Sequence, residues 1–371
     1  MWSRERWRLL LRLVVAAAAA VIRGLASAPA EAAPLEIGFY RGTCPRAEET
    51  VLEEMKLILM EDKTLAPSLL RMHYHDCFVQ GCDGSIMLKS RKKKAERDAL
   101  PNRSMRGYDA IERIKARLET LCPRTVSCAD IIALAARDAV FLSHGPRYDV
   151  ETGRRDGNVS VAEYAENDLA PPDSNIVDVK TFFSVKSLNS KDIAVLFGSY
   201  FLSLQPTLMA CFLSSPPHIL VAFPSRCHSI GTSHCAPIQK RLYNFTGNMD
   251  QDPSLDPAYA AKLKKLCPPP RPGDDDGSEG KTTKVPMDPG SGFTFDLSYY
   301  RHVLATGGLF QSDGSLLNDP VTRGYVEKVA NASSPDEYYH DFAEAMVKMG
   351  RTDVLYGDQG EIRPTCGVFV D

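Results

Sequence analysis

A short stretch of the chain places a guanidinium and an imidazole where they could act together. Apolar residues at helical spacing predict a helix over Pro67–Phe78, and within it Arg71 and His75 lie four residues apart, on one face. An imidazole can carry a proton from the near to the far oxygen of a bound peroxide, and a guanidinium can stabilise the charge that develops as the O–O bond breaks. The spacing therefore suits peroxide chemistry, although an Arg/His pair taken alone is more often a surface feature without function.

Oxygen-bearing side chains follow this pair in a turn-rich segment. Asp76, Asp83 and Ser85 are close in sequence, and Gly81 and Gly84 favour turns between them. Carboxylate and hydroxyl oxygens at such close spacing are the ligands that Ca²⁺ prefers. We therefore expect a calcium site beside the predicted helix.

The same segment also carries residue types that could bind zinc. His73, His75, Cys77 and Cys82 offer the nitrogen and sulfur ligands of zinc sites. Cys77 and Cys82 could instead form a disulfide across a short turn. Signs of export, described below, favour the disulfide because an oxidising compartment maintains such bonds.

The run from Arg71 to Ser85, R-x-H-x-H-D-C-F-V-x-G-C-D-x-S, resembles the distal-helix signature of the secreted class III plant haem peroxidases. The resemblance implies that His75 is the distal acid and base, that Arg71 is its partner, and that Cys77 and Cys82 form a disulfide. It also implies a distal Ca²⁺, bound by side chains and main-chain carbonyls of Asp76, Val79, Gly81, Asp83 and Ser85.

Two further features belong to this motif. Glu96–Asn102 resembles the family's E-[KR]-D-x-x-x-N, which implies that Asn102 accepts the Nδ1–H of the distal histidine and that Glu96 supports the network. That hydrogen bond leaves Nε2 free as the base. Asn102 also begins one of four N-x-S/T sequons, so glycosylation is its alternative role. Tyr74 stands where the family usually has Phe, and its added hydroxyl needs a partner.

His228 is the residue that the resemblance implies as the axial haem ligand. Leu196–Ser199 and His228–Cys235 resemble the two halves of the family's L-S-G-[AG]-H-[ST]-[IF]-G-x-x-x-C. Asp313, in a segment similar to G-L-x-x-S-D, would accept the ligand's Nδ1–H and increase its electron donation to iron. The resemblance further implies a proximal Ca²⁺, bound by Ser229, Asp288, Ser291, Thr294 and Asp296.

Tyr200–Cys227 separates the two halves of that motif and fits nothing around it. Arg226 is its only charged side chain, but prolines interrupt it too often for a membrane-spanning helix. We expect this insertion to be foreign to the fold and to weaken haem binding, because it interrupts the helix that should aim His228. The alternative is a tolerated surface loop closed by a disulfide between Cys211 and Cys227.

The remaining motifs concern the framework and the haem edge. Leu169–Pro172 resembles the family's L-P-x-P, which implies that the main-chain carbonyl of Ala170 contacts a phenolic donor. The resemblance also implies four disulfides, pairing Cys44 with Cys122, Cys77 with Cys82, Cys128 with Cys366, and Cys235 with Cys267.

Helical periodicity predicts the elements that must position these side chains. Ser127 is a candidate N-cap for one of them, and strand signals are weak and short. Together with the resemblance, the pattern implies a mainly α fold with minor β structure, in which distal and proximal helical lobes enclose haem b. Besides Pro67–Phe78, the predicted helices are Ala47–Glu61, Tyr108–Leu121, Cys128–Leu142, Asp178–Val185 and Tyr338–Met349.

Composition and the N-terminal residues bear on location. The chain has 371 residues and a formal net charge of −3, so no global field points to nucleic acid. Arginines followed by the apolar run Leu13–Ile22 and small residues predict a secretory signal peptide over residues 1–33, with the peroxidase-like domain at residues 34–371. We expect a secreted monomer in the cell wall or vacuole, with no membrane association once the signal is removed.

These inferences converge on one function and leave two alternatives. The main prediction is an enzyme that reduces hydrogen peroxide with electrons from small phenolic donors, using one haem b and two Ca²⁺. The first alternative is a secreted, haem-free protein without peroxidase activity, disabled by the Tyr200–Cys227 insertion. The second is a zinc-binding module, which depends on the His/Cys cluster alone.

Overall fold

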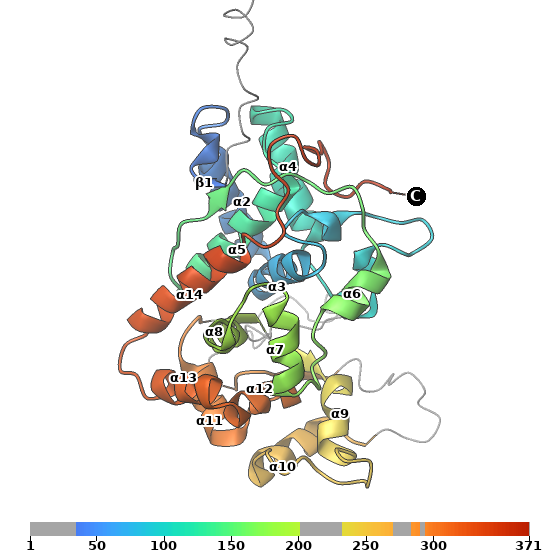
Figure 1. Ribbon diagram of the computed structural model, residues 1–371, viewed down its shortest axis with the longest axis vertical. Helices are drawn as coiled ribbons and strands as arrows, with labels where there is room; N and C mark the ends of the chain where they lie inside the picture. The colour runs from blue at the N-terminus through green and yellow to red at the C-terminus, as the bar shows by residue number, and fades with distance from the viewer. Residues whose placement is uncertain (1–34, 201–231, 270–282, 290–293, 371) are drawn as a thin grey trace, which may run out of the picture.

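A computed structural model describes residues 35–200, 232–269, 283–289 and 294–370. This part of the chain is mainly helical, with two small antiparallel sheets (Figure 1). The predicted signal peptide, the Tyr200–Cys227 insertion after its first residue, His228, Ser229 and Ser291 lie outside the described residues. The α-helices are α2 (Ala47–Glu61), α3 (Leu65–Phe78), α4 (Tyr108–Leu121), α5 (Cys128–Leu142), α6 (Ala162–Asp168), α7 (Ile176–Ser184), α8 (Ser190–Tyr200), α9 (Ala236–Tyr243), α10 (Pro257–Leu266), α11 (Ser298–Thr306), α12 (Gln311–Ser315), α13 (Pro320–Ala330) and α14 (Asp336–Met349).

The remaining elements are short. In the first sheet, β1 (Glu36–Ile37) pairs antiparallel with β2 (Glu151–Thr152). In the second, β3 (Thr232–His234) pairs antiparallel with β4 (Lys284–Pro286). Single 3₁₀ turns complete the list: η1 (Phe39–Arg41), η2 (Ser85–Met87), η3 (Glu96–Asp98), η4 (Leu100–Asn102) and η6 (Leu316–Asn318).

Side chains at the helix starts explain several of these boundaries. The Ser127 hydroxyl accepts a hydrogen bond from the Asp130 backbone N–H at 3.1 Å, which confirms the predicted cap of α5. Asn175 and Asp319 cap α7 and α13 in the same way. Each cap satisfies backbone donors that the first helical turn leaves without an intrahelical partner.

Helix α3 lies near the middle of the molecule in Figure 1, with α2, α4, α5 and α14 on one side and α7 to α13 on the other. It packs most extensively against α5, whose residues are almost all buried. The main core runs through both groups of helices, and a smaller core joins α9 and α10 to β4 and to Leu309 and Phe310. The catalytic-type residues of α3 therefore lie at the junction of the two helical groups.

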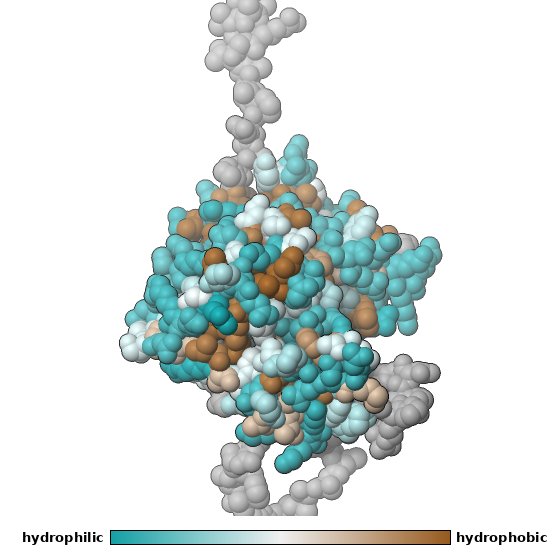
Figure 2. Space-filling model, turned by 60° about the horizontal axis from the view of Figure 1, so that its bottom comes forward, coloured by the Kyte–Doolittle hydropathy of each residue, from teal (hydrophilic) through white to brown (hydrophobic). Residues whose placement is uncertain are grey.

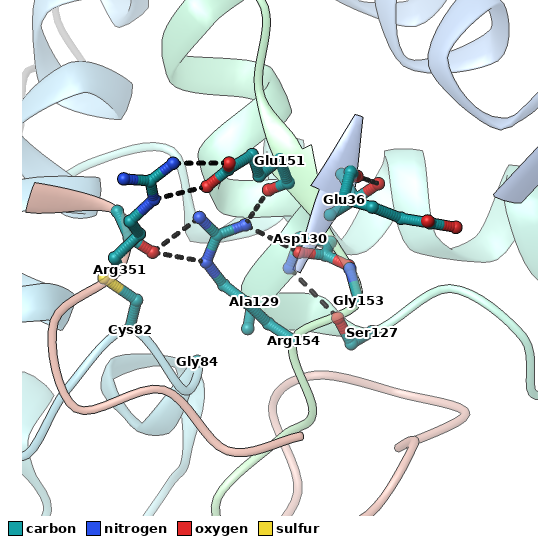
Figure 3. A network of polar contacts seen from close by, with 12 residues as sticks. Glu36, Cys82, Gly84, Ser127, Ala129, Asp130, Glu151, Gly153, Arg154 and Arg351 are labelled. Carbon is teal, nitrogen blue, oxygen red and sulfur yellow. Dashed lines mark hydrogen bonds and ion pairs between the residues drawn. The ribbon is translucent and has the colours of Figure 1, made fainter. Parts of the chain in front are cut away.

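A buried ion pair ties distant segments of the distal half together (Figure 3). Arg154 Nη1 donates to Asp130 Oδ1 at 2.8 Å, and both side chains are buried. The Tyr40 hydroxyl and the Gly153 N–H donate to Asp130 Oδ2, each at 2.7 Å. Arg154 Nε donates to the Gly350 carbonyl at 3.0 Å, so the network joins η1, α5 and the end of α14.

The C-terminal segment folds back against the loop that follows α3. The Arg363 backbone N–H donates to Asp156 Oδ2 at 3.0 Å, and its guanidinium donates to the Gly84 carbonyl at 2.6 Å. Three residues later Cys366 is bonded to Cys128 at the start of α5. The C-terminal segment thus packs against the predicted distal calcium loop and is hydrogen-bonded to it.

Candidate active site

One face of α3 carries the residues predicted to act on peroxide. Arg71, Tyr74, His75 and Phe78 follow the i, i+3, i+4, i+7 spacing that aligns side chains on a helix. Arg71 and His75 are buried, and Arg71 Nε donates a hydrogen bond to His75 Nε2 at 3.0 Å. The predicted pair is therefore brought together by one turn of helix.

The neighbours of His75 define which ring nitrogen carries the proton. Arg71 can only donate, so Nε2 must accept, and Nδ1 carries the hydrogen. Nδ1 lies 2.5 Å from Asn102 Oδ1, and Asn102 Nδ2 donates to the Glu96 carbonyl at 2.9 Å. Burial, reinforced by the charge of Arg71, holds the pKa of His75 well below its usual range. The imidazole is therefore neutral, with Nε2 available as a base.

Arg71 is held by more than the histidine. Its Nη2 donates to the Pro101 carbonyl at 2.5 Å and its Nη1 to Ser104 Oγ at 3.2 Å. Burial lowers the pKa of Arg71 to about 10, so the guanidinium remains charged at neutral pH. The segment that contains η4 thus positions both the arginine and, through Asn102, the histidine.

Tyr74 belongs to an aromatic group beside the pair. Its ring centroid lies 5.5 Å from that of His75 and 4.1 Å from that of Phe78. Phe183 of α7 stacks on Tyr74 at 6.2 Å and contacts Phe197 of α8 at 5.9 Å. Burial raises the pKa of the Tyr74 hydroxyl, so the phenol is protonated at neutral pH.

The predicted distal calcium loop places two carboxylates together in the interior. Asp76 and Asp83 are both buried, and burial followed by repulsion from Asp83 raises the pKa of Asp76 well above its usual range. Burial and the same Asp83 charge raise the pKa of Glu96 to about 8. The Ser85 hydroxyl is buried without a hydrogen bond of good geometry. Clustered acids and an unsatisfied oxygen fit a divalent cation, which would relieve both costs.

On the proximal side, Asp313 is buried and accepts three hydrogen bonds. The Tyr299 hydroxyl donates to its Oδ1 at 2.8 Å, and the Phe310 and Leu309 N–H groups donate to its Oδ2 at 2.8 and 3.1 Å. Burial raises the pKa of Asp313. His228, its predicted partner, lies outside the described residues, so that contact remains a prediction.

The predicted proximal calcium residues are only partly described. Asp288 and Asp296 approach each other, because the Ser298 hydroxyl is hydrogen-bonded to both carboxylates. Thr294 is exposed. Burial and repulsion from Asp296 raise the pKa of Asp288. The raised pKa of Asp76 in the distal loop likewise indicates that negative charges are crowded there.

Ala170, the predicted donor contact, is half-buried two residues after the end of α6. The segment that follows it is anchored to the proximal side, because the Ser312 N–H donates to the Pro172 carbonyl at 3.2 Å. Ser312 immediately precedes Asp313, so the predicted haem-edge segment and the predicted proximal acid are held in one local framework.

Most of the chain is similar in sequence to known proteins. A family model described as Peroxidase matches residues 51–332. The chain is 44% identical to Peroxidase 1 of Oryza sativa subsp. japonica, covering 97% of this chain and 98% of that protein. It is 43% identical to Peroxidase 3 of Arabidopsis thaliana, covering 91% and 92%. The chain belongs to the plant peroxidase family. This peroxidase is an oxidoreductase, and these relatives do not support the alternative of a protein without peroxidase activity.

The cysteines of this peroxidase decide against the zinc alternative. His73 Nδ1 lies 3.6 Å from Cys77 Sγ, but that sulfur is bonded to Cys82 and cannot act as a thiolate ligand. Within the described ranges no group of three or more His, Cys, Asp or Glu side chains offers the ligand set of a zinc site. The structure contains the four disulfides that the family resemblance implies: Cys44–Cys122, Cys77–Cys82, Cys128–Cys366 and Cys235–Cys267.

The sequons of the peroxidase fall into two groups. Asn102 is buried and its amide is engaged with His75 and Glu96, which leaves no room for a glycan in the folded protein. Asn158, Asn244 and Asn331 are exposed. Figure 2 shows a mainly hydrophilic surface around small apolar patches. None of the helices in the described part is both long and apolar enough to cross a membrane.

Sequence reasoning missed two residues of the peroxidase's proximal side. Tyr299 belongs to none of the predicted ligand sets, yet its hydroxyl donates to Asp313. Ser298 was not considered, although it bridges the two proximal carboxylates. The Asp-x-Ser pattern at the start of α11 was an available signal, because its aspartate accepts from the Ser298 N–H at 2.8 Å.

Proposed function

We propose that this peroxidase binds one haem b between α3 and the segment around His228, and reduces hydrogen peroxide with electrons from small phenols. The hydrogen-bonded series Arg71, His75, Asn102 and Glu96 carries the proposal, because it holds a neutral imidazole whose unprotonated Nε2 faces a buried cation. Haem, when bound, would supply the redox chemistry. His228 would be its axial ligand and Asp313 would hold that ligand's Nδ1–H.

The residues of α3 account for the proton movements. His75 Nε2 accepts the proton from one peroxide oxygen and returns it to the other, which then leaves as water. Arg71 stabilises the negative charge that develops on the departing oxygen. Asn102 keeps Nδ1 protonated throughout, so that Nε2 remains the reacting nitrogen. The carbonyl of Ala170 would contact a phenolic donor.

Haem titration of the purified full-length chain tests this proposal. A Soret absorbance band that saturates at one haem per chain, together with peroxide-dependent oxidation of a small phenol, is expected. A chain that is folded by circular dichroism but gives neither signal would contradict the proposed function.

Two Ca²⁺ ions complete the proposed cofactor set. The distal ion would be bound by Asp76, Val79, Gly81, Asp83 and Ser85, and the proximal ion by Ser229, Asp288, Ser291, Thr294 and Asp296. The buried carboxylates of the distal loop and the half-buried carboxylates of the proximal loop support this assignment, because a cation would offset their mutual repulsion.

Removal of Ca²⁺ is expected to lower the melting temperature by several degrees. A ligand present at 100 times its dissociation constant stabilises the folded state by about 2.7 kcal/mol. Thermal unfolding should be followed with Ca²⁺, after exhaustive chelation, and after re-addition of Ca²⁺ or Mg²⁺. Only Ca²⁺ should restore the original value, and equal melting temperatures in all four samples would refute both sites.

The Tyr200–Cys227 insertion gives a separate prediction about haem affinity. Deletion of residues 200–227 should tighten haem binding, because Ser199 and His228 would then be adjacent, as in the family motif. Haem titrations of the full chain and the deletion variant, both checked for folding, make the comparison. Equal affinity and equal peroxidase activity would instead favour the tolerated loop closed by Cys211 and Cys227.

A further inference from the structure

Tyr74 occupies a distinctive place on α3. Between Ala66 and Phe78 every other residue is buried, whereas Tyr74 keeps part of its surface accessible. It shares a helix face with Arg71 and His75, and its ring lies 5.5 Å from the imidazole. A phenol is therefore placed beside the acid–base pair, on the same face of α3.

The surroundings of Tyr74 make it the oxidisable member of its group. The phenylalanine rings of Phe78 and Phe183 lie 4.1 and 6.2 Å from the Tyr74 ring, and neither carries a hydroxyl. A phenol loses an electron more readily than a plain benzene ring, provided that its proton can leave. The pocket that would admit peroxide to His75 would also give the Tyr74 proton a route to solvent.

Tyr108 is the natural comparison, because it also lies within electrostatic range of Arg71. The guanidinium carbon of Arg97 sits 4.0 Å from the centroid of the Tyr108 ring, and this positive charge opposes removal of an electron from the ring. The Tyr108 hydroxyl is also buried without a hydrogen-bond partner, so no acceptor is available for its proton. Two independent contacts therefore disfavour oxidation of Tyr108.

We propose that Tyr74 is an internal one-electron donor in the reaction of this peroxidase with hydrogen peroxide. The inference rests on the proposed function, which supplies the oxidant. Reduction of one peroxide to two waters consumes two electrons and two protons. Tyr74 supplies one of the electrons and releases its phenolic proton to solvent, becoming a neutral phenoxyl radical, and the other electron comes from the haem.

External phenols then restore the starting state. One phenol transfers a hydrogen atom to the Tyr74 radical and regenerates the hydroxyl. A second phenol returns an electron to the haem and releases a proton. Each cycle thus converts one peroxide and two phenols into two waters and two phenoxyl radicals, and Tyr74 is unchanged.

Freeze-quench electron paramagnetic resonance on the haem-loaded full chain tests the proposal. After one equivalent of peroxide and no phenol, the wild type should give a tyrosyl signal that changes shape when the protein contains ring-deuterated tyrosine. Tyr74→Phe, which keeps the ring and removes the hydroxyl, should lose this signal, and Tyr108→Phe should keep it. Peptide mapping after repeated peroxide treatment should find oxidation at Tyr74 in the wild type.

The outcomes separate this inference from the function on which it rests. A tyrosyl signal of equal intensity in Tyr74→Phe would overturn the assignment and direct attention to another tyrosine. A wild type that binds haem and consumes peroxide without a tyrosyl signal would overturn the inference and leave the proposed function standing. A wild type that shows no Soret band would overturn both.

Discussion

Replacement of His75 by alanine should slow the reaction with hydrogen peroxide by about 10²–10⁴-fold, the range that a positioned acid–base group contributes. The expectation follows from the geometry around the imidazole. Nε2 faces the Arg71 guanidinium and Nδ1 faces Asn102, so the ring is held neutral and in one orientation. Stopped-flow spectroscopy of the haem-loaded variant measures the rate directly.

Arg71→Leu should produce a comparable loss, because a leucine cannot stabilise the charge on the departing oxygen. Haem titration is the necessary control, since neither residue is proposed to bind the iron. Both variants should show a Soret band and melt close to the wild type. If either variant with a normal Soret band reacted with peroxide at the wild-type rate, the distal assignment would be wrong.

Arg154→Leu should lower the free energy of unfolding by about 3–5 kcal/mol, because it leaves the Asp130 carboxylate buried without its counter-ion. The Gly350 carbonyl would also lose its donor. Urea unfolding followed by circular dichroism measures the change. The loss of the Arg154–Asp130 ion pair should also disturb Arg71 and His75 indirectly, because Asp130 is on α5 and α5 packs against α3.

Arg351→Leu is a matched control for this prediction. Arg351 forms two contacts of 2.6 Å with Glu151 close to Arg154 (Figure 3), but its side chain is 60% exposed, whereas that of Arg154 is 2% exposed. An exposed ion pair contributes at most about 1 kcal/mol. Similar losses in the two variants would show that burial does not determine the strength of this network.

Local patterns predicted six of the thirteen α-helices in the described residues. Predicted bounds for Ala47–Glu61, Tyr108–Leu121 and Cys128–Leu142 agree with α2, α4 and α5. These segments combine helical periodicity with clear ends, so neighbouring residues carry the information. The start of α3 was placed two residues late, at Pro67 instead of Leu65, because a proline is compatible with the first turn of a helix and does not mark its first residue.

Contacts between distant segments were less accessible to sequence reasoning. The i, i+4 spacing placed Arg71 beside His75, but Asn102 reached the site only through resemblance to a family motif. The Tyr299–Asp313 and Arg71–Pro101 hydrogen bonds join residues whose spacing has no fixed meaning in a helix or turn. Such contacts depend on how helices pack, and no local periodicity encodes that arrangement.

The C-terminal segment has a consequence for the order of events during synthesis. Arg363 closes the wall of the distal loop through Gly84, and Cys366 is joined to Cys128. Both partners leave the ribosome more than two hundred residues earlier, since the two cysteines are 238 residues apart. At about 5–20 residues per second, the distal half waits at least about ten seconds for its last wall. Oxidation of the Cys128–Cys366 bond therefore cannot occur until long after the distal half has been synthesised.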